Sequence, residues 1–237
     1  MNFDTIAIIG AGAMGSGIAQ LLVQNGYNTL LYDAHAEALQ RSVAGIHKRL
    51  QQQERKGRLS DAQCQAAIDA LGTAIDLAAL QSADLLIEAV PERLDIKKQV
   101  FAQLDCIAAT NAIFASNTSG LDIDQLAAAT QRPAQVIGLH FFNPPPLMPL
   151  VEIARGVATS DATFTALQAL ALSLGKTPIA VANRPGFAVN RILFPMINEA
   201  ICALAEGVAS AEDIDRAMQL GASHPLGPLA LADFVGL

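Results

Sequence analysis

The segment TIAIIGAGAMGSGIAQLL near the start of the chain constrains the fold more than any other part of the sequence. An apolar strand pattern over residues 6–9 leads through three glycines into an amphipathic helix, in the order of the dinucleotide-binding fingerprint. Gly10 permits a tight turn, Gly12 lets a pyrophosphate approach the backbone, and Gly15 allows the helix to pack closely on the strand. The free amides at the helix N-terminus then face the phosphates. We expect nucleotide contacts from Gly10, Ala11, Gly12, Ala13, Met14 and Gly15.

A second apolar strand, 29–32, ends at Asp33. An acid about twenty residues after the glycines accepts hydrogen bonds from the adenosine ribose and repels a 2′-phosphate. No Lys or Arg follows until Arg41, so NAD is predicted rather than NADP. The alternative is that Asp33 is an ordinary turn residue at a strand end.

Composition fits a cytoplasmic α/β enzyme. The chain has 237 residues, 52% of them hydrophobic, which is enough for a full α/β core and a second domain. Its net charge of −7 argues against a general nucleic-acid partner. Neither a membrane-spanning run nor room for a signal peptide is found, so no membrane partner is expected. The three cysteines lack the spacing of metal ligands, so no metal site is expected either.

Strand and helix patterns alternate as far as residue 182, which predicts a doubly wound, Rossmann-type sheet. After the nucleotide unit we expect helices over 36–56, 61–71, 92–108 and 161–174. Strands are expected over 84–89, 112–116 and 177–182, with two more around His140 and Glu152.

The pattern breaks at Asn183-Arg184-Pro185-Gly186, and only helices follow, over 187–205, 211–220 and from about Pro228. We therefore expect an NAD-binding domain over 1–184 and an all-helical C-terminal domain over 185–237. The apolar helical pattern still runs at Gly236-Leu237 without a cap, which leaves open that the chain continues.

His140 and Glu152 stand twelve residues apart in GLHFFNPPPLMPLVEI. Glu152 lies between Val151 and Ile153 in a strand that reads as buried, where an unpaired carboxylate is costly. The prolines between the two residues stiffen the connection, so one strand could fold back beside the other. An imidazole–carboxylate pair of this kind moves protons in catalysis. The alternative is that His140 caps a strand and Glu152 is half exposed.

Other polar residues follow predicted strands at the edge of the sheet where ligands bind. Glu92 and Lys97 could face a nicotinamide ribose, or be a helix-start acid and a surface cation. The run Ser116-Asn117-Thr118-Ser119-Gly120 offers hydroxyl and amide donors, although a turn capped by Asp122 explains it too. Asn190 stands in an otherwise apolar helix start, where it could cap the helix, point to solvent or face the cleft.

Six segments together resemble the L-3-hydroxyacyl-CoA dehydrogenases, in particular the bacterial 3-hydroxybutyryl-CoA and 3-hydroxyadipyl-CoA dehydrogenases. They are GAGAMGSGIA, IEAVPERLDIKK, FASNTS, GLHFFNPPPLMPLVEI, RPGFAVNRIL and HPLGPLALADFVGL, and the likeness covers the whole chain. The resemblance implies NAD-dependent, reversible oxidation of an L-3-hydroxyacyl-CoA, in fatty-acid β-oxidation or phenylacetate catabolism. It makes His140 and Glu152 the catalytic pair and assigns substrate binding to Ser119 and Asn190. The NAD contacts that it implies are Glu92, Lys97, Ser119 and Asn143.

The resemblance also implies a CoA-phosphate site and a homodimer. Five cations lie within eleven residues, Lys48, Arg49, Arg55, Lys56 and Arg58, and on a helix Arg49 and Lys56 share a face seven residues apart. Family members bind the CoA nucleotide near this position, whereas a solvated helix face is the alternative. The helical domain of the family dimerises and closes over the acyl chain. It is normally longer than the part beyond Gly186, and a basic residue that reaches NAD near its end has no counterpart here.

Departures from the family pattern leave the acyl-chain preference open. Pro145 and Pro149 replace the usual Val or Ala and Lys, and Ala188 replaces a bulkier residue. Some relatives are lens crystallins or act on free sugar acids such as gulonate. His140 and Glu152 argue against the first alternative, and the basic cluster argues against the second. A 6-phosphogluconate-type dehydrogenase would need a catalytic Lys motif that we do not find.

Overall fold

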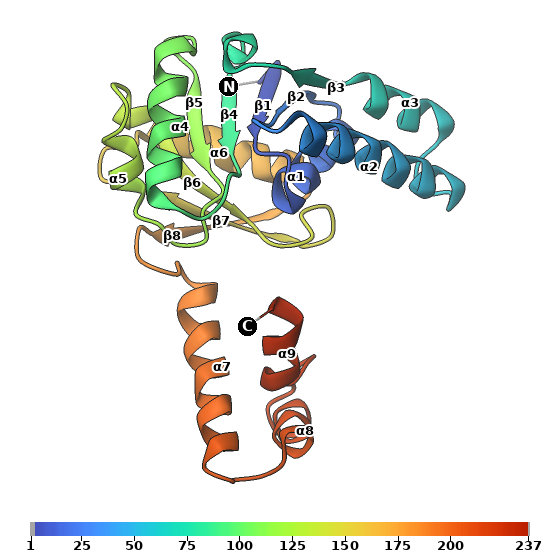
Figure 1. Ribbon diagram of the computed structural model, residues 1–237, viewed down its shortest axis with the longest axis vertical. Helices are drawn as coiled ribbons and strands as arrows, with labels where there is room; N and C mark the ends of the chain where they lie inside the picture. Colours follow the sequence, from blue (N-terminus) through green and yellow to red (C-terminus); the bar gives the residue numbers. More distant parts are fainter. Residues whose placement is uncertain (1–2, 237) are drawn as a thin grey trace. The chain divides into compact units, whose positions relative to one another are not determined.

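An eight-stranded sheet forms the centre of the first unit of the computed structural model, which describes residues 3–236 (Figure 1). Its strand order is β3-β2-β1-β4-β5-β6-β7-β8. The strands β1 to β6 are parallel, whereas β7 runs antiparallel to β6 and β8 runs parallel to β7. The strands are β1 (Thr5–Ile9), β2 (Asn28–Tyr32), β3 (Leu71–Ala74), β4 (Leu85–Glu88), β5 (Ile113–Ser116), β6 (Val136–Phe141), β7 (Leu150–Arg155) and β8 (Thr177–Ala182). The predicted doubly wound sheet is confirmed.

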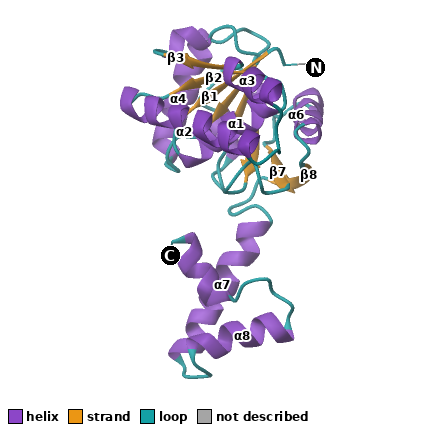
Figure 2. Cartoon of the chain, turned by 90° about the vertical axis from the view of Figure 1, so that its right-hand side faces the viewer, coloured by secondary structure: helices purple, strands orange, loops and turns teal. Residues whose placement is uncertain are grey.

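Helices cover both faces of this sheet, and α4 and α6 lie on opposite faces (Figures 1 and 2). The helices are α1 (Ala13–Gln24), α2 (Ala36–Arg55), α3 (Asp61–Asp69), α4 (Leu94–Ile107), α5 (Ile123–Ala127) and α6 (Asp161–Ser173), with short 3₁₀ turns η1 (Leu77–Leu80) and η2 (Pro133–Gln135). Alternate strand residues such as Ile6, Ile8 and Ile153 join the core beneath α1, α2, α3 and α6. The intervening residues, which include His140 and Glu152, therefore point to the other face.

Two elements differ from the sequence-based expectation. The residues Leu71–Ala74 form strand β3 at the sheet edge, so the preceding helix ends at Asp69. The sequence LGTA is short and only partly buried, and it carries no apolar alternation. Helix α5 was also not expected. Its five residues are too few to show a helical period, although Asp122, the expected cap, does accept a hydrogen bond from the Asp124 amide (3.0 Å).

The second compact unit, Gly186–Leu237, is helical as expected. It contains α7 (Val189–Ala205), α8 (Ala211–Gly221) and α9 (Pro228–Val235). The Asp215 carboxylate of α8 accepts hydrogen bonds from the Leu229 and Ala230 amides (2.8 and 2.9 Å) and so caps α9. The expectation of an uncapped end is wrong, because Gly236 adopts a left-handed conformation (φ +85°) that terminates α9. Within residues 3–236, no helix is both long and apolar enough to cross a bilayer.

Candidate active site

Each of the three glycines after β1 suits its position for a different reason. Gly10 has φ +106°, and a Cβ there would lie 2.6 Å from the carbonyl oxygen of Ala89. A Cβ on Gly15 would lie 1.8 Å from the carbonyl oxygen of Gly10, so only glycine allows α1 to pack this closely. Nothing lies within 4 Å of a Cβ built on Gly12. The loop thus presents open backbone at the N-terminus of α1, which is the shape that a dinucleotide pyrophosphate requires.

Asp33 is fixed beside this glycine loop. Its Oδ2 accepts a hydrogen bond from the Ala11 amide (2.8 Å), and its Oδ1 accepts one from the His35 amide (2.8 Å). A carboxylate has about four acceptor positions, so these two bonds orient the group and leave capacity for ribose hydroxyls. The geometry fits an adenosine ribose next to the pyrophosphate site.

His140 and Glu152 form a buried hydrogen-bonded pair. They stand directly opposite each other in the antiparallel ladder of β6 and β7. The Nδ1 atom of His140 lies 2.8 Å from Oε2 of Glu152, and the two residues are 6% and 1% exposed. The ring of Phe142 packs on the imidazole with a centroid separation of 4.4 Å. The predicted hydrogen bond is therefore confirmed, and the alternative of a half-exposed Glu152 is wrong.

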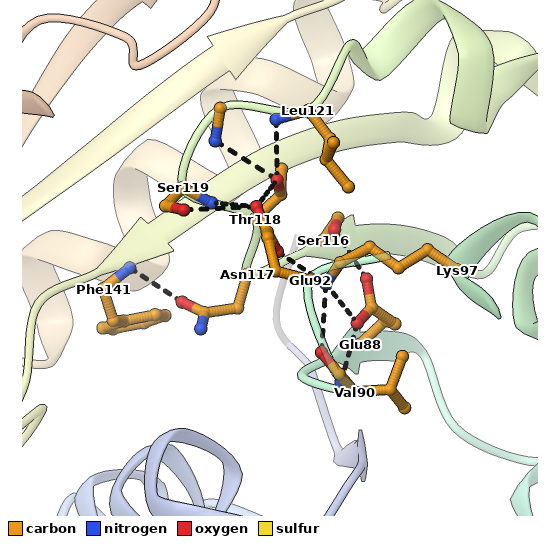
Figure 3. A network of polar contacts seen from close by, with 11 residues as sticks. Glu88, Val90, Glu92, Lys97, Ser116, Asn117, Thr118, Ser119, Leu121 and Phe141 are labelled. Carbon is orange, nitrogen blue, oxygen red and sulfur yellow. Dashed lines mark hydrogen bonds and ion pairs between the residues drawn. The ribbon is translucent and has the colours of Figure 1, made fainter. Parts of the chain in front are cut away.

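A buried ion pair lies at the ends of β4 and β5 (Figure 3). The Lys97 ammonium lies 2.6 Å from Oε1 of Glu88, and both side chains are fully buried. Ser116 donates a hydrogen bond to the other Glu88 oxygen (2.6 Å). Burial raises the pKa of Glu88, and the nearby Lys97 charge partly offsets that effect. The alternative reading of Lys97 as a surface cation is wrong.

The same lysine connects this pair to the polar loop after β5. Lys97 also lies 3.2 Å from Oε2 of Glu92. The Oε1 atom of Glu92 accepts hydrogen bonds from the Thr118 hydroxyl and from the amide and hydroxyl of Ser119 (2.8 and 3.2 Å; Figure 3). Burial opposes ionisation of Glu92, but Lys97 and these donors lower its pKa below the usual value. Glu92 therefore holds Ser119, and it does not start α4, which begins at Leu94.

Asn117 fastens this loop to the strand that carries the histidine. Its Oδ1 accepts a hydrogen bond from the Phe141 amide (2.9 Å), one residue after His140 (Figure 3). The ends of β4, β5 and β6 are therefore connected through polar side chains. Sequence reasoning placed Glu88 in the polar segment that ends at Glu92 but gave it no role, although the signal that identified Glu152, a carboxylate in an apolar strand, is present in DLLIEAV as well.

A cleft of about 440 Å³ lies along α1, α2 and the loop between β6 and β7. Arg49, Lys56 and Arg58 line it, whereas Lys48 and Arg55 of the basic cluster do not. The Arg49 guanidinium donates hydrogen bonds to Ser16 (2.7 Å) and to Gln20. The cleft therefore combines three cations with the helix that follows the glycine loop, which suits a phosphorylated ligand.

The remaining predicted residues lie in two places. Asn143 is exposed in the loop after β6 and lines the same cleft. Asn190 is the second residue of α7 and belongs to the other unit, so its part in the site stays a prediction.

A glycine-rich loop at a strand–helix turn, an acid at the end of the next strand and a buried His–Glu pair define a dinucleotide-dependent dehydrogenase. Two family models cover nearly the whole chain: "3-hydroxyacyl-CoA dehydrogenase, NAD binding domain" matches residues 5–184, and the C-terminal domain of the same family matches residues 186–237. The chain belongs to the 3-hydroxyacyl-CoA dehydrogenase family and is an oxidoreductase with an NAD-binding domain.

Individual proteins agree with this family. The chain is 45% identical to a probable 3-hydroxybutyryl-CoA dehydrogenase of Bacillus subtilis over all of its own length and 83% of that protein. It is 44% identical to a 3-hydroxyadipyl-CoA dehydrogenase of Escherichia coli, of which it covers 50%. The crystal structure of (S)-3-hydroxybutyryl-CoA dehydrogenase from Ralstonia eutropha superposes with a TM-score of 0.96 at 47% identity, covering 99% of this chain and 83% of that one.

Proposed function

We propose that this protein catalyses the reversible, NAD-dependent oxidation of an L-3-hydroxyacyl-CoA to the 3-ketoacyl-CoA. The substrates that we propose carry short or dicarboxylic acyl chains, such as 3-hydroxybutyryl-CoA or 3-hydroxyadipyl-CoA, as the names of the relatives suggest. The observation that carries the proposal is the buried pair of His140 and Glu152 in the sheet that also holds the glycine loop.

Proton transfer is the task that falls to this pair. Bound NAD supplies the hydride acceptor, and the backbone of the glycine loop together with Asp33 would hold it. Because Nδ1 of His140 is bonded to Glu152, the Nε2 atom is the one that accepts the proton of the C3 hydroxyl. Glu152 keeps the ring in one orientation and stabilises the imidazolium as it forms. In the reverse direction His140 returns the proton to the ketone oxygen.

Two further side chains are proposed to hold the C3 oxygen. Ser119 is pre-positioned by Glu92, and its hydroxyl bond to that carboxylate is the longest of the three at 3.2 Å, so the hydroxyl can turn toward a ligand. The family resemblance assigns the second role to Asn190. The direct test is NADH consumption with a panel of 3-ketoacyl-CoA thioesters of increasing chain length. A protein that reduces none of them while oxidising a free sugar acid would contradict the proposal.

Cofactor choice follows from Asp33. A 2′-phosphate beside this carboxylate meets repulsion, and no Lys or Arg follows Asp33 until Arg41, so kcat/KM with NADH should exceed that with NADPH by at least about a hundredfold. Steady-state kinetics with the two cofactors measures the ratio. An Asp33→Ser variant should narrow it, because the repulsion is removed while a ribose hydrogen bond is kept. Equal kcat/KM values for the wild-type enzyme would show that Asp33 is only a turn residue.

The CoA nucleotide is proposed to lie against Arg49 and Lys56. Changing both residues to Ala should raise KM for an acyl-CoA about tenfold, leave kcat nearly unchanged and weaken the salt dependence of binding. The matched control changes Lys48 and Arg55, which do not line the cleft, to Ala. A pantetheine thioester lacks the nucleotide, so the wild-type enzyme and the Arg49/Lys56 variant should use it equally poorly. Equal losses on both substrates would assign the cluster a structural role.

We also propose a cytoplasmic homodimer that forms through the helical unit. Its support is apolar surface on this unit: Ile192, Ile201 and Val208 are 70%, 47% and 69% exposed. Exposed apolar side chains of this kind often become covered by a partner. Analytical ultracentrifugation of the protein, with and without Ile192→Asp, would distinguish dimer from monomer.

A further inference from the structure

Lys176, the residue before β8, is a buried cation held by backbone carbonyls. It is 7% exposed, and its ammonium donates hydrogen bonds to the carbonyl oxygens of Pro145 (2.7 Å) and Met148 (2.9 Å). Within residues 3–236 it forms no ion pair with a carboxylate. Burial accordingly lowers the pKa of Lys176. A buried ammonium is costly, so an apolar side chain would suit this place better unless the two hydrogen bonds matter.

The loop between β6 and β7, whose carbonyl groups accept these bonds, has few N–H donors of its own. Of the residues 144–149, four are prolines without an N–H, and only Leu147 and Met148 carry backbone amides. Both amides donate to the carbonyl of Pro144 (2.9 and 3.0 Å). The carbonyls of Pro145 and Met148 depend on Lys176, and that of Pro149 takes the Thr177 amide (2.7 Å). The interior of the loop is thus anchored by two consecutive residues at the start of β8.

Helix α1 closes on the same loop. A Cβ built on Gly17 would lie 2.6 Å from Cδ of Pro145, so the proline ring rests directly on the helix. Pro145 is buried between α1 and the Lys176 ammonium that binds its carbonyl. The distance between the loop and α1 is therefore fixed by this contact, and the contact requires glycine at position 17.

This loop forms part of the cleft that the cations line. It contributes residues 143–147, while α1 contributes Ser16, α2 contributes Arg49, and Lys56 follows the end of α2. Any movement of the loop changes the width of the cleft between the loop prolines on one side and the cations on the other. Lys176 itself does not line the cleft, so it can act only through the loop.

We propose that Lys176 is a positioning residue, which supplies the donors that the prolines lack and so sets the width of the nucleotide cleft. The identity of the ligand, CoA, rests on the proposed function. We call this arrangement, in which Lys176 and α1 hold the loop from two sides, the clamp. The evidence for the clamp is the hydrogen bonds of Lys176 and the contact between Gly17 and Pro145.

The test replaces Lys176 by Met, which keeps the length of the side chain but removes its donors. Lys98→Met is the matched control, because Lys98 is half-buried on α4 and its side chain makes no hydrogen bond or ion pair among the residues described. Amide hydrogen exchange at Leu147 and Met148 should become about tenfold faster in Lys176→Met and remain unchanged in the control. The dissociation constant of free CoA, measured by calorimetry, should rise at least about fivefold, and kcat should change less than about twofold. Lys176→Gln retains N–H donors and should restore part of both effects.

Two results would overturn the proposal. Unchanged exchange at Leu147 and Met148 would show that Lys176 does not hold the loop, and faster exchange with unchanged CoA affinity would show that the loop does not set the cleft. If Lys176→Met does not fold, Lys176→Gln decides by the same two measurements. Neither measurement needs turnover. A wild-type protein that binds CoA but reduces no ketoacyl-CoA would therefore contradict the proposed function and leave the clamp standing.

Discussion

Replacing Glu152 by Gln should lower kcat by about two orders of magnitude or more. Glutamine preserves the shape of the side chain, but it is neutral and cannot stabilise the imidazolium that forms on His140. Both groups are almost fully buried, so water cannot take over this role. Steady-state kinetics at pH 7 with saturating acyl-CoA and NAD measures the effect.

The control for this variant is NAD binding, which should remain unchanged because Glu152 lies in β7 and the glycine loop follows β1. Fluorescence titration with NADH would establish that the nucleotide site is intact. Turnover close to that of the wild-type enzyme would refute the catalytic pair.

Replacing Lys97 by Met should destabilise the protein by about 3–5 kcal/mol, the largest stability effect that we expect from a single substitution. The variant leaves Glu88 fully buried without its counter-ion. Lys98→Met on the same helix serves as the control and should change the free energy of unfolding by less than about 0.5 kcal/mol. Urea unfolding measures both.

The double variant Glu88→Gln/Lys97→Met separates stability from function. It removes both charges, so most of the lost unfolding free energy should return. We expect Lys97→Met also to lower activity, and the double variant should not restore it, because Glu92 has lost the ammonium that helps to hold it beside Ser119 in both variants. Recovery of both properties would make the buried pair purely structural.

The direction in which the stability of Lys97→Met changes with pH follows from the ionisation of Glu88. Burial raises the pKa of this carboxyl above its unfolded value, and Lys97→Met removes the charge that offsets it most while leaving the hydrogen bonds from Ser116 and the Val90 amide. The contribution of such a group to stability is present at low pH and is lost as pH rises through the folded-state pKa. The deficit of the variant relative to wild type should therefore be larger at about pH 8 than at about pH 5.

The nucleotide unit and the pairing of His140 with Glu152 could be predicted because each has a local physical signature. The glycines stand at a strand–helix turn, and the carboxylate stands in an apolar strand that proline residues allow to fold back. The burial of Lys97 could not be predicted in the same way, since a lone cation on a helix looks like a surface residue. Only the position of Glu88 in the folded protein shows why Lys97 is buried.

Lys176 shows a different limit. Nothing in the local sequence LGKTPIA distinguishes a lysine that binds distant carbonyls from one that faces solvent. Its role depends on a loop almost thirty residues earlier that has few amide donors, and this relation becomes visible only when each carbonyl is traced to its partner. Short elements such as β3 and α5 escape prediction because they are too short to show a period.

The pairing of β6 with β7 also limits how this enzyme can tolerate insertions. His140 faces Glu152 only because the two residues share a register position, and successive side chains of a strand point to opposite faces. An insertion that shifts the register of either strand by one residue would turn one partner to the far face and abolish catalysis, even if the sheet still formed. The same insertion at the exposed tip of the loop, near Leu147, would leave the ladder intact. Length variation that keeps the catalytic pair is therefore expected at the loop tip and not in the strands, and it would change the cleft that the loop lines.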